Sequence, residues 1–238
     1  MLQSNNPSNN PTSSDQDYDL PWQSNATRFW WVRHAPVSDM QDIMYGTRDV
    51  EADTSDHQQF KSLSRRLPEN AIWFTSHLKR TQQTAHAVAT AGINWKERHE
   101  TNLIGEMEFG DDTGKTHAEL IEQRNDPYVG FWPKSPFEKK PGAESMEDVC
   151  QRVGEFVASC AKEYAQQDIV CFSHMGTILA ALTNALSLDL HNSLSFSINN
   201  LSVTRIHHHA SLHPEAPIYR VMTVSELCLL YTSDAADE

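Results

Sequence analysis

The hydrophobic positions of this chain form two kinds of pattern, short continuous runs and helix-spaced stripes. The continuous runs predict strands at 28–33, 71–75, 168–173, 196–207 and 218–225, with a short one near 99–103. Apolar residues at steps of three and four predict helices at 57–66, 79–91, 116–124, 145–166 and 177–187. The alternation of the two patterns predicts an α/β fold with a mainly parallel sheet.

The longest predicted helix follows the longest predicted loop. In 145–166 the apolar residues share one helix face, and Ser145 with Asp148 predicts a capping arrangement at the start. The segment 105–143 is rich in glycine, proline and charge. We expect this segment to form an excursion over one face of the sheet.

A single domain, residues 26–227, accounts for all of these elements, because no linker or repeat interrupts them. Residues 1–25 lack the basic start and apolar centre of a secretory signal, and their polar composition predicts a disordered leader. Residues 228–238, "CLLYTSDAADE", do not continue the preceding pattern and resemble the translation of a sequencing adapter. We expect this tail to be non-native and the natural C-terminus to be missing.

Charge and composition narrow the class of partner. The formal net charge of −13 argues against a surface for nucleic acid or for anionic membranes. No apolar run approaches the ~18 residues that span a bilayer. Cys150, Cys160 and Cys171 have no metal-like spacing, so we expect reduced thiols and a cytoplasmic protein.

The histidine-rich run "RIHHHASLH", residues 205–213, raises the question of a metal site. Adjacent residues on a strand point to opposite faces, so three consecutive histidines rarely ligate one ion. We therefore predict a polar turn between the last two strands, and no metal site.

Polar residues follow three of the predicted strands in the same way. The runs "VRHAP", "FTSHLKRTQQTA" and "FSHMGT" each place cationic or imidazole side chains where an apolar strand ends. Taken singly, each such residue is more often a surface charge or a cap. Because ligands of open α/β sheets bind at the carboxyl ends of the strands, the repeated pattern predicts that Arg33, His34, Arg80 and His174 converge.

Two guanidiniums and two imidazoles in one crevice suit a phosphoryl group. Arginine presents a planar fork of donors that matches phosphate oxygens. Gly176, at the start of the helix after the third strand, would add a backbone N–H group and the positive helix end. A neutral imidazole in line with phosphorus can attack it and form a phosphohistidine. A carboxylic acid usually supplies the proton that the leaving oxygen needs.

The motifs "VRHAP", "TSHLKRTQQTA", "GEMEFG", "PGAES" and "FSHMGT" resemble, in order and spacing, those of the histidine phosphatase superfamily, also called phosphoglycerate-mutase-like proteins. The resemblance covers roughly residues 28–226. It implies a three-layer α/β/α fold with a mainly parallel sheet. It also implies a phosphomonoester hydrolase that acts on a small phosphorylated metabolite and requires neither a metal ion nor another cofactor.

The resemblance implies a role for each matching residue. His34 would be the nucleophile that becomes phosphorylated, and Arg33 and Arg80 would grip the phosphate. His174 would contact the phosphate and stabilise the transition state. Glu106 falls where the family places its proton donor, shortly before an aromatic residue and a glycine. Water would then hydrolyse the phosphohistidine, with Glu106 acting as the base.

The chain departs from the family pattern at several positions. Ala35, Val37 and Met40 replace the glycine and two polar residues that often follow the Arg-His pair. These changes argue against a glycolytic mutase. Met175 stands where a second glycine is common, and residues 112–114 replace a frequent Trp-Glu-Gly, so part of the substrate wall differs.

Tyr45-Gly46 with Asp49 resembles the bacterial branch that includes alpha-ribazole phosphatase. Two other functions remain open, a phosphoglycerate-type phosphomutase and a non-catalytic phosphate-binding module. The sequence also leaves open the physiological substrate and the oligomeric state, including a homodimer.

Overall fold

The computed structural model describes residues 25–38, 40, 42–125, 135–210 and 217–227. The predicted leader and the predicted non-native tail lie outside these residues, apart from the leader's last residue, and the predicted domain boundaries stay predictions. Within the described residues one sheet has the strand order β3-β2-β4-β1-β5-β6. The strands are β1 (Ala26–Arg33), β2 (Ala71–Thr75), β3 (Trp95–Glu100), β4 (Asp168–Ser173), β5 (Val203–His209) and β6 (Ile218–Glu226).

The strand pairing confirms the predicted mainly parallel sheet. Strand β4 lies parallel to both β1 and β2, and β3 lies parallel to β2. The antiparallel pairs are β1 with β5 and β5 with β6. The α/β class predicted from the sequence is therefore correct.

Two strand boundaries differ from the prediction. Strand β5 begins at Val203 instead of residue 196, and it continues through His207–His209, where we predicted a turn. That turn is wrong because these histidines pair with residues 26–28 of β1, and strand pairing outweighs their polarity. Strand β3 lies at 95–100 because it is a polar edge strand whose exposed side chains carry little apolar signal.

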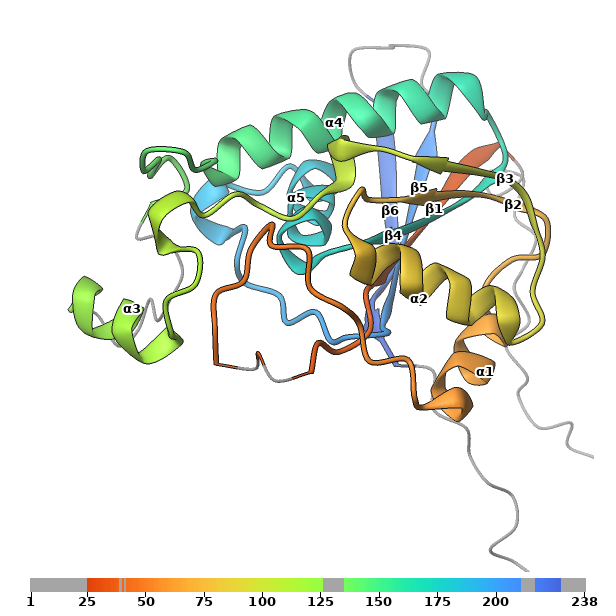
Figure 1. Cartoon of the computed structure of the whole chain (residues 1–238). Helices are drawn as coiled ribbons and strands as arrows, with labels where there is room; N and C mark the ends of the chain where they lie inside the picture. The colour runs from red at the N-terminus through yellow and green to blue at the C-terminus, as the bar shows by residue number, and fades with distance from the viewer. Residues whose placement is uncertain (1–24, 39, 41, 126–134, 211–216, 228–238) are drawn as a thin grey trace, which may run out of the picture.

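Helices cover both faces of the sheet (Figure 1). One apolar cluster joins strand residues such as Trp31 and Phe74 to α4 and α5, and a second joins Val32 and Trp73 to α1 and α2. This is the three-layer arrangement that the resemblance implies. The helices are α1 (His57–Arg66), α2 (Lys79–Thr90), α3 (His117–Arg124), α4 (Met146–Glu163) and α5 (Met175–Leu186).

Helix starts agree with the local sequence signals. Ser145 and Asp148 form the predicted reciprocal cap at the start of α4. Helix α5 begins at Met175, two residues before the predicted start, which places His174 at the N-cap position. The His174 side chain makes no capping hydrogen bond. Its ring is therefore available for other contacts.

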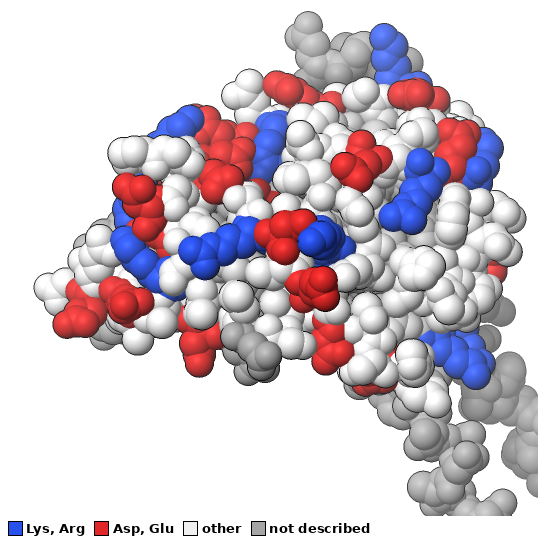
Figure 2. Space-filling view, viewed as in Figure 1, with Lys and Arg blue, Asp and Glu red and all other residues white. Residues whose placement is uncertain are grey.

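The excursion after β3 contains α3, which lies away from the sheet in Figure 1. A buried ionic cluster ties this region together, because Asp112 pairs with Lys115, Arg124 and Lys140. Figure 2 shows acidic and basic side chains interspersed on one face of the molecule. In the described part of the chain, none of the helices has the length and apolarity needed to span a membrane.

Candidate active site

The three predicted strand ends lie together because β4 pairs with both β1 and β2. Arg33 and Ser173 are partners in the register of β1 and β4, so the residues that follow them are neighbours. The N–H group of His34 donates to the carbonyl oxygen of Ser173 at 3.0 Å. The ring centroids of His34 and His174 are 5.2 Å apart. The two imidazoles therefore meet at the carboxyl edge of the sheet.

The tautomer of His34 follows from its surroundings. Its Nδ1 lies 2.7 Å from the carbonyl oxygen of Ala35, which can only accept a hydrogen bond. Nδ1 therefore carries the proton, and the lone pair of the neutral ring is on Nε2. Burial, followed by the charges of Arg80 and Arg33, holds the pKa of His34 well below its usual value. At neutral pH the ring is thus uncharged, with Nε2 as a nucleophilic atom.

Arg80 is fully buried, and backbone carbonyls hold its guanidinium in place. Its terminal nitrogens donate to the carbonyl oxygens of Gly46 at 2.7 Å and Arg48 at 2.8 Å. Its Nε donates to Nδ1 of His174 at 3.2 Å. The guanidinium also lies over the ring of Tyr45, 5.1 Å from the centroid. These contacts fix one orientation of the positive charge beside the imidazoles.

The ring of His174 has a partner on each nitrogen. Because Arg80 donates to Nδ1, the proton of the neutral ring is on Nε2, which donates to Oγ of Ser76 at 2.8 Å. The Ser76 hydroxyl lies 2.9 Å from that of Thr81, and the Thr81 hydroxyl donates to the carbonyl oxygen of Leu78. Burial, followed by the charge of Arg80, holds the pKa of His174 well below its usual value. Our sequence reasoning missed Ser76 and Thr81, although both lie in the quoted "TSHLKRTQQTA".

Glu106 contacts the start of α5. Its Oε1 accepts hydrogen bonds from the backbone N–H groups of Met107 at 2.9 Å and Gly176 at 3.1 Å. The Gly176 N–H group, which we predicted to bind phosphate, therefore donates to a carboxylate in this structure. A Cβ atom at position 176 would lie 2.6 Å from Oε1, so the approach depends on glycine. Phosphate binding by Gly176 stays a prediction.

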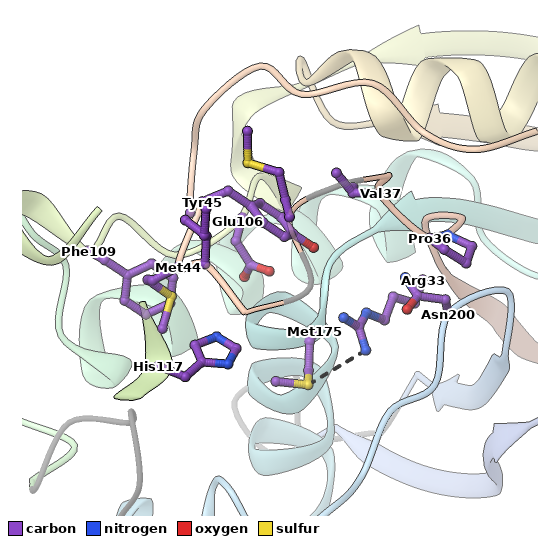
Figure 3. Close-up of a pocket in the computed structure, with 13 residues that line it drawn as sticks. Arg33, Pro36, Val37, Met44, Tyr45, Glu106, Phe109, His117, Met175 and Asn200 are labelled. Atoms are coloured by element: carbon purple, nitrogen blue, oxygen red, sulfur yellow. Dashed lines mark hydrogen bonds between the residues drawn. The ribbon is translucent and has the colours of Figure 1, made fainter. Parts of the chain in front are cut away.

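A cavity of about 420 Å³ opens beside this cluster (Figure 3). Arg33, Tyr45 and Glu106 line it. Arg33 donates to the carbonyl oxygen of Ile198, and its buried Nε has no hydrogen-bond partner among the described residues. Arg33 thus lines the cavity with one buried donor unsatisfied.

His34, Arg80 and His174 do not line the cavity, and at most 1% of each is exposed. Tyr45 lines the cavity and also packs its ring edge-on against His34, with centroids 6.4 Å apart. Tyr45 therefore contacts both the cavity and the buried imidazole of His34.

The acidic residues crowded around Glu106 have different surroundings. Glu108 accepts a hydrogen bond from the Thr47 hydroxyl at 2.7 Å, and Asp112 is held by the lysines and arginine of the ionic cluster. Asp111 is exposed. Among the described residues that line the cavity, Glu106 supplies the carboxylate.

Residues 29–213 match the model of the histidine phosphatase superfamily (branch 1). The chain belongs to the histidine phosphatase superfamily. This membership confirms the predicted family and agrees with the predicted enzyme class, a phosphatase.

The relatives of this chain include proteins named as phosphatases and proteins named as mutases. The chain is 29% identical over 184 residues to phosphoserine phosphatase 1 of Hydrogenobacter thermophilus, covering 74% of this chain and 84% of that protein. It is 30% identical over 125 residues to a 2,3-bisphosphoglycerate-dependent phosphoglycerate mutase of Cytophaga hutchinsonii, covering 51% of this chain and 59% of the mutase.

Solved structures show the same fold. A mycobacterial glucosyl-3-phosphoglycerate phosphatase aligns with a TM-score of 0.72 at 21% identity, over 84% of this chain and 99% of that chain. A putative alpha-ribazole-5'-P phosphatase from Escherichia coli aligns with a TM-score of 0.66 at 19% identity, over 85% and 98%. At these identities the likeness is one of fold, so the narrower alpha-ribazole resemblance stays a prediction.

Gly46 gives a test of how closely this histidine phosphatase depends on the orientation of Arg80. Its φ of +48° favours glycine, and a Cβ atom there would lie 2.9 Å from Cδ2 of Phe109. We expect Gly46→Ala to shift the carbonyl that holds Arg80 and to lower kcat/KM for p-nitrophenyl phosphate by roughly 10- to 100-fold. Steady-state kinetics on the purified variant measures this.

Gly92→Ala is the matched control, because Gly92 also has a positive φ but no atom within 4 Å of its Cβ position. We expect this control to lose some stability and to keep its activity per folded molecule. Equal losses of activity in both variants would show that backbone strain, and not the orientation of Arg80, is responsible.

Proposed function

We propose that the protein hydrolyses a small phosphomonoester through a phosphohistidine on His34, without a metal ion. The observation that carries the proposal is the hydrogen bond from Nδ1 of His34 to the carbonyl oxygen of Ala35, which leaves the Nε2 lone pair of a neutral ring. His34 lies close to the guanidiniums of Arg80 and Arg33, and the Tyr45 ring that packs against it lines the cavity that also contains the Glu106 carboxylate. Nucleophile, positive charge and acid are thus present together.

In the first step, Nε2 of His34 forms a bond to phosphorus and the bond between phosphorus and the ester oxygen breaks. The leaving oxygen takes the proton of the Glu106 carboxylic acid. The guanidiniums of Arg33 and Arg80 stabilise the charge on the non-bridging oxygens. In the second step, the Glu106 carboxylate takes a proton from water, which attacks phosphorus and releases phosphate and His34.

His174 has a less direct role in this proposal than the family resemblance implies. Both of its ring nitrogens are occupied, one by Arg80 and one by Ser76. We infer that His174 positions Arg80 until a phosphate arrives. Direct contact between His174 and the phosphate requires one of these hydrogen bonds to be exchanged.

The charges of the site support metal-independent chemistry. The guanidiniums of Arg33 and Arg80 provide the positive charge that a metal ion provides in other phosphatases.

Hydrolysis of p-nitrophenyl phosphate in the presence of EDTA tests the proposal. We expect the rate to be unchanged by EDTA and unchanged by added Mg²⁺. Loss of turnover in EDTA, restored by a divalent cation, would contradict metal independence. Binding of vanadate without any turnover would favour the non-catalytic module.

A second assay separates a phosphatase from a mutase. Incubation with 3-phosphoglycerate, followed by separation of the products, is expected to show free phosphate or no reaction. Formation of the 2-isomer would overturn the hydrolase in favour of the phosphomutase.

A further inference from the structure

We infer that the preferred substrate carries its phosphate on an apolar alcohol or phenol and has no second anionic group. This inference rests on the proposed function and specifies the substrate class of the same site. It departs from the relatives named for phosphoserine and phosphoglycerate, both of which carry a carboxylate.

One wall of the cavity is apolar and comes from separate parts of the chain. Val37, Ile43 and Met44 come from the loop after β1, Phe109 comes from the excursion, and Met175 begins α5 (Figure 3). Met44 and Phe109 are only 6% and 8% exposed and belong to the same core cluster. The wall is therefore held by core packing, and its shape does not depend on surface side chains.

The described residues that line the cavity include no second cation that could pair with another anionic group of the substrate. Among the described residues that line it, Arg33 is the only arginine or lysine, and Glu106 is the only carboxylate. Burial lowers the pKa of His117, although the charge of Asp42 opposes this, so His117 is mainly neutral at neutral pH. Once Arg33 binds the phosphate, a carboxylate on the substrate would be desolvated without a counter-charge.

Two further lining residues favour an apolar substrate. Asn200 already donates its side-chain N–H to the carbonyl oxygen of His34 at 2.8 Å. Met175 places its sulfur 3.9 Å from a terminal nitrogen of Arg33, directly beside the expected phosphate position. A flexible thioether adapts to apolar groups of different shape. Met175 stands where the family commonly has a second glycine, and its side chain lines the cavity.

A matched pair of substrates tests the inference, hexyl phosphate and its analogue with a carboxylate at the far end of the chain. Both have a primary alkoxide leaving group, so the chemical step is comparable. We expect kcat/KM for the carboxylate analogue to be lower by roughly tenfold or more. Equal or faster turnover of the carboxylate analogue would overturn the inference, while leaving the hydrolase mechanism in place.

Variants at Met175 show whether the wall sets this preference. We expect Met175→Lys to lower the ratio of kcat/KM for hexyl phosphate to kcat/KM for the carboxylate analogue, because it adds a cation to the cavity. Met175→Leu should leave this ratio unchanged. Circular dichroism and thermal unfolding of both variants serve as the measure of folding. A ratio that Met175→Lys leaves unchanged would contradict the role of the apolar wall.

Binding to His34→Ala separates this inference from the proposed function. Calorimetry with this variant compares the two ligands without turnover, and we expect hexyl phosphate to bind more tightly. This preference supports the substrate class even if the chain proves to have no hydrolase activity. Equal or tighter binding of the carboxylate analogue would overturn the inference whatever the rate of turnover.

Discussion

His34→Ala is expected to lower the kcat of p-nitrophenyl phosphate hydrolysis by roughly 10⁴-fold or more, because it removes the atom that accepts the phosphoryl group. The neighbouring groups cannot take over. His174 is the nearest imidazole, but its nitrogens are bonded to Arg80 and Ser76. Arg33, Arg80 and Glu106 would remain, so the variant should still bind vanadate. Loss of turnover with retained binding is the result that identifies the nucleophile.

The matched control is His191→Ala, since 65% of the His191 side chain is exposed and its ring pairs with Asp189. We expect wild-type kinetics from this control. A second measurement follows the intermediate directly, by quenching with base after mixing with radiolabelled substrate. Label on the wild-type protein but not on His34→Ala is expected. Turnover by His34→Ala at a rate like that of the wild type would rule out the mechanism.

Glu106→Gln is expected to affect substrates according to their leaving groups. A glutamine keeps the oxygen that accepts from Met107 and Gly176, so the backbone contacts remain. It cannot donate the proton that an alkoxide needs, and we expect hydrolysis of hexyl phosphate to fall by roughly 10²- to 10⁴-fold. p-Nitrophenolate leaves without protonation, so formation of the phosphohistidine from its ester should be much less affected. Steady-state and burst kinetics with both substrates measure the difference.

Glu108→Gln is the control, because Glu108 lies two residues away and bonds to the Thr47 hydroxyl. We expect this variant to show no dependence on the leaving group. If Glu106→Gln slowed the first step for both esters by the same factor, Glu106 would act through its charge or position and not as an acid.

The sequence predicted most of the fold because the apolar runs of β1, β2 and β4 are buried on both faces and therefore continuous. It also predicted helix α1 to the residue, since the N-cap residue Asp56 and the basic end of 57–66 mark its limits. The sheet edges were harder to predict. Strand β3 is polar, and the histidines of β5 gain their strand conformation from pairing with β1, which no local pattern records.

The candidate site could be predicted only where it lies on regular elements. The sheet topology brings together four residues that lie at or next to a strand end or a helix start: Arg33, His34, Arg80 and His174. The groups that orient them were missed. Arg80 is held by the carbonyl oxygens of Gly46 and Arg48, and a backbone carbonyl has no signature in the sequence. The position of the Tyr45 ring against His34 likewise depends on loop geometry.

Strand β1, which carries His34, lies in the interior of the sheet between β4 and β5. Both neighbours must separate before its backbone is released, so its amide hydrogens should exchange with solvent only through global unfolding. The edge strands β3 and β6 can open without disturbing it. On heating, the enzyme should therefore keep its phosphoryl-accepting geometry until the domain melts as a whole, with no earlier inactivation from local opening of this strand.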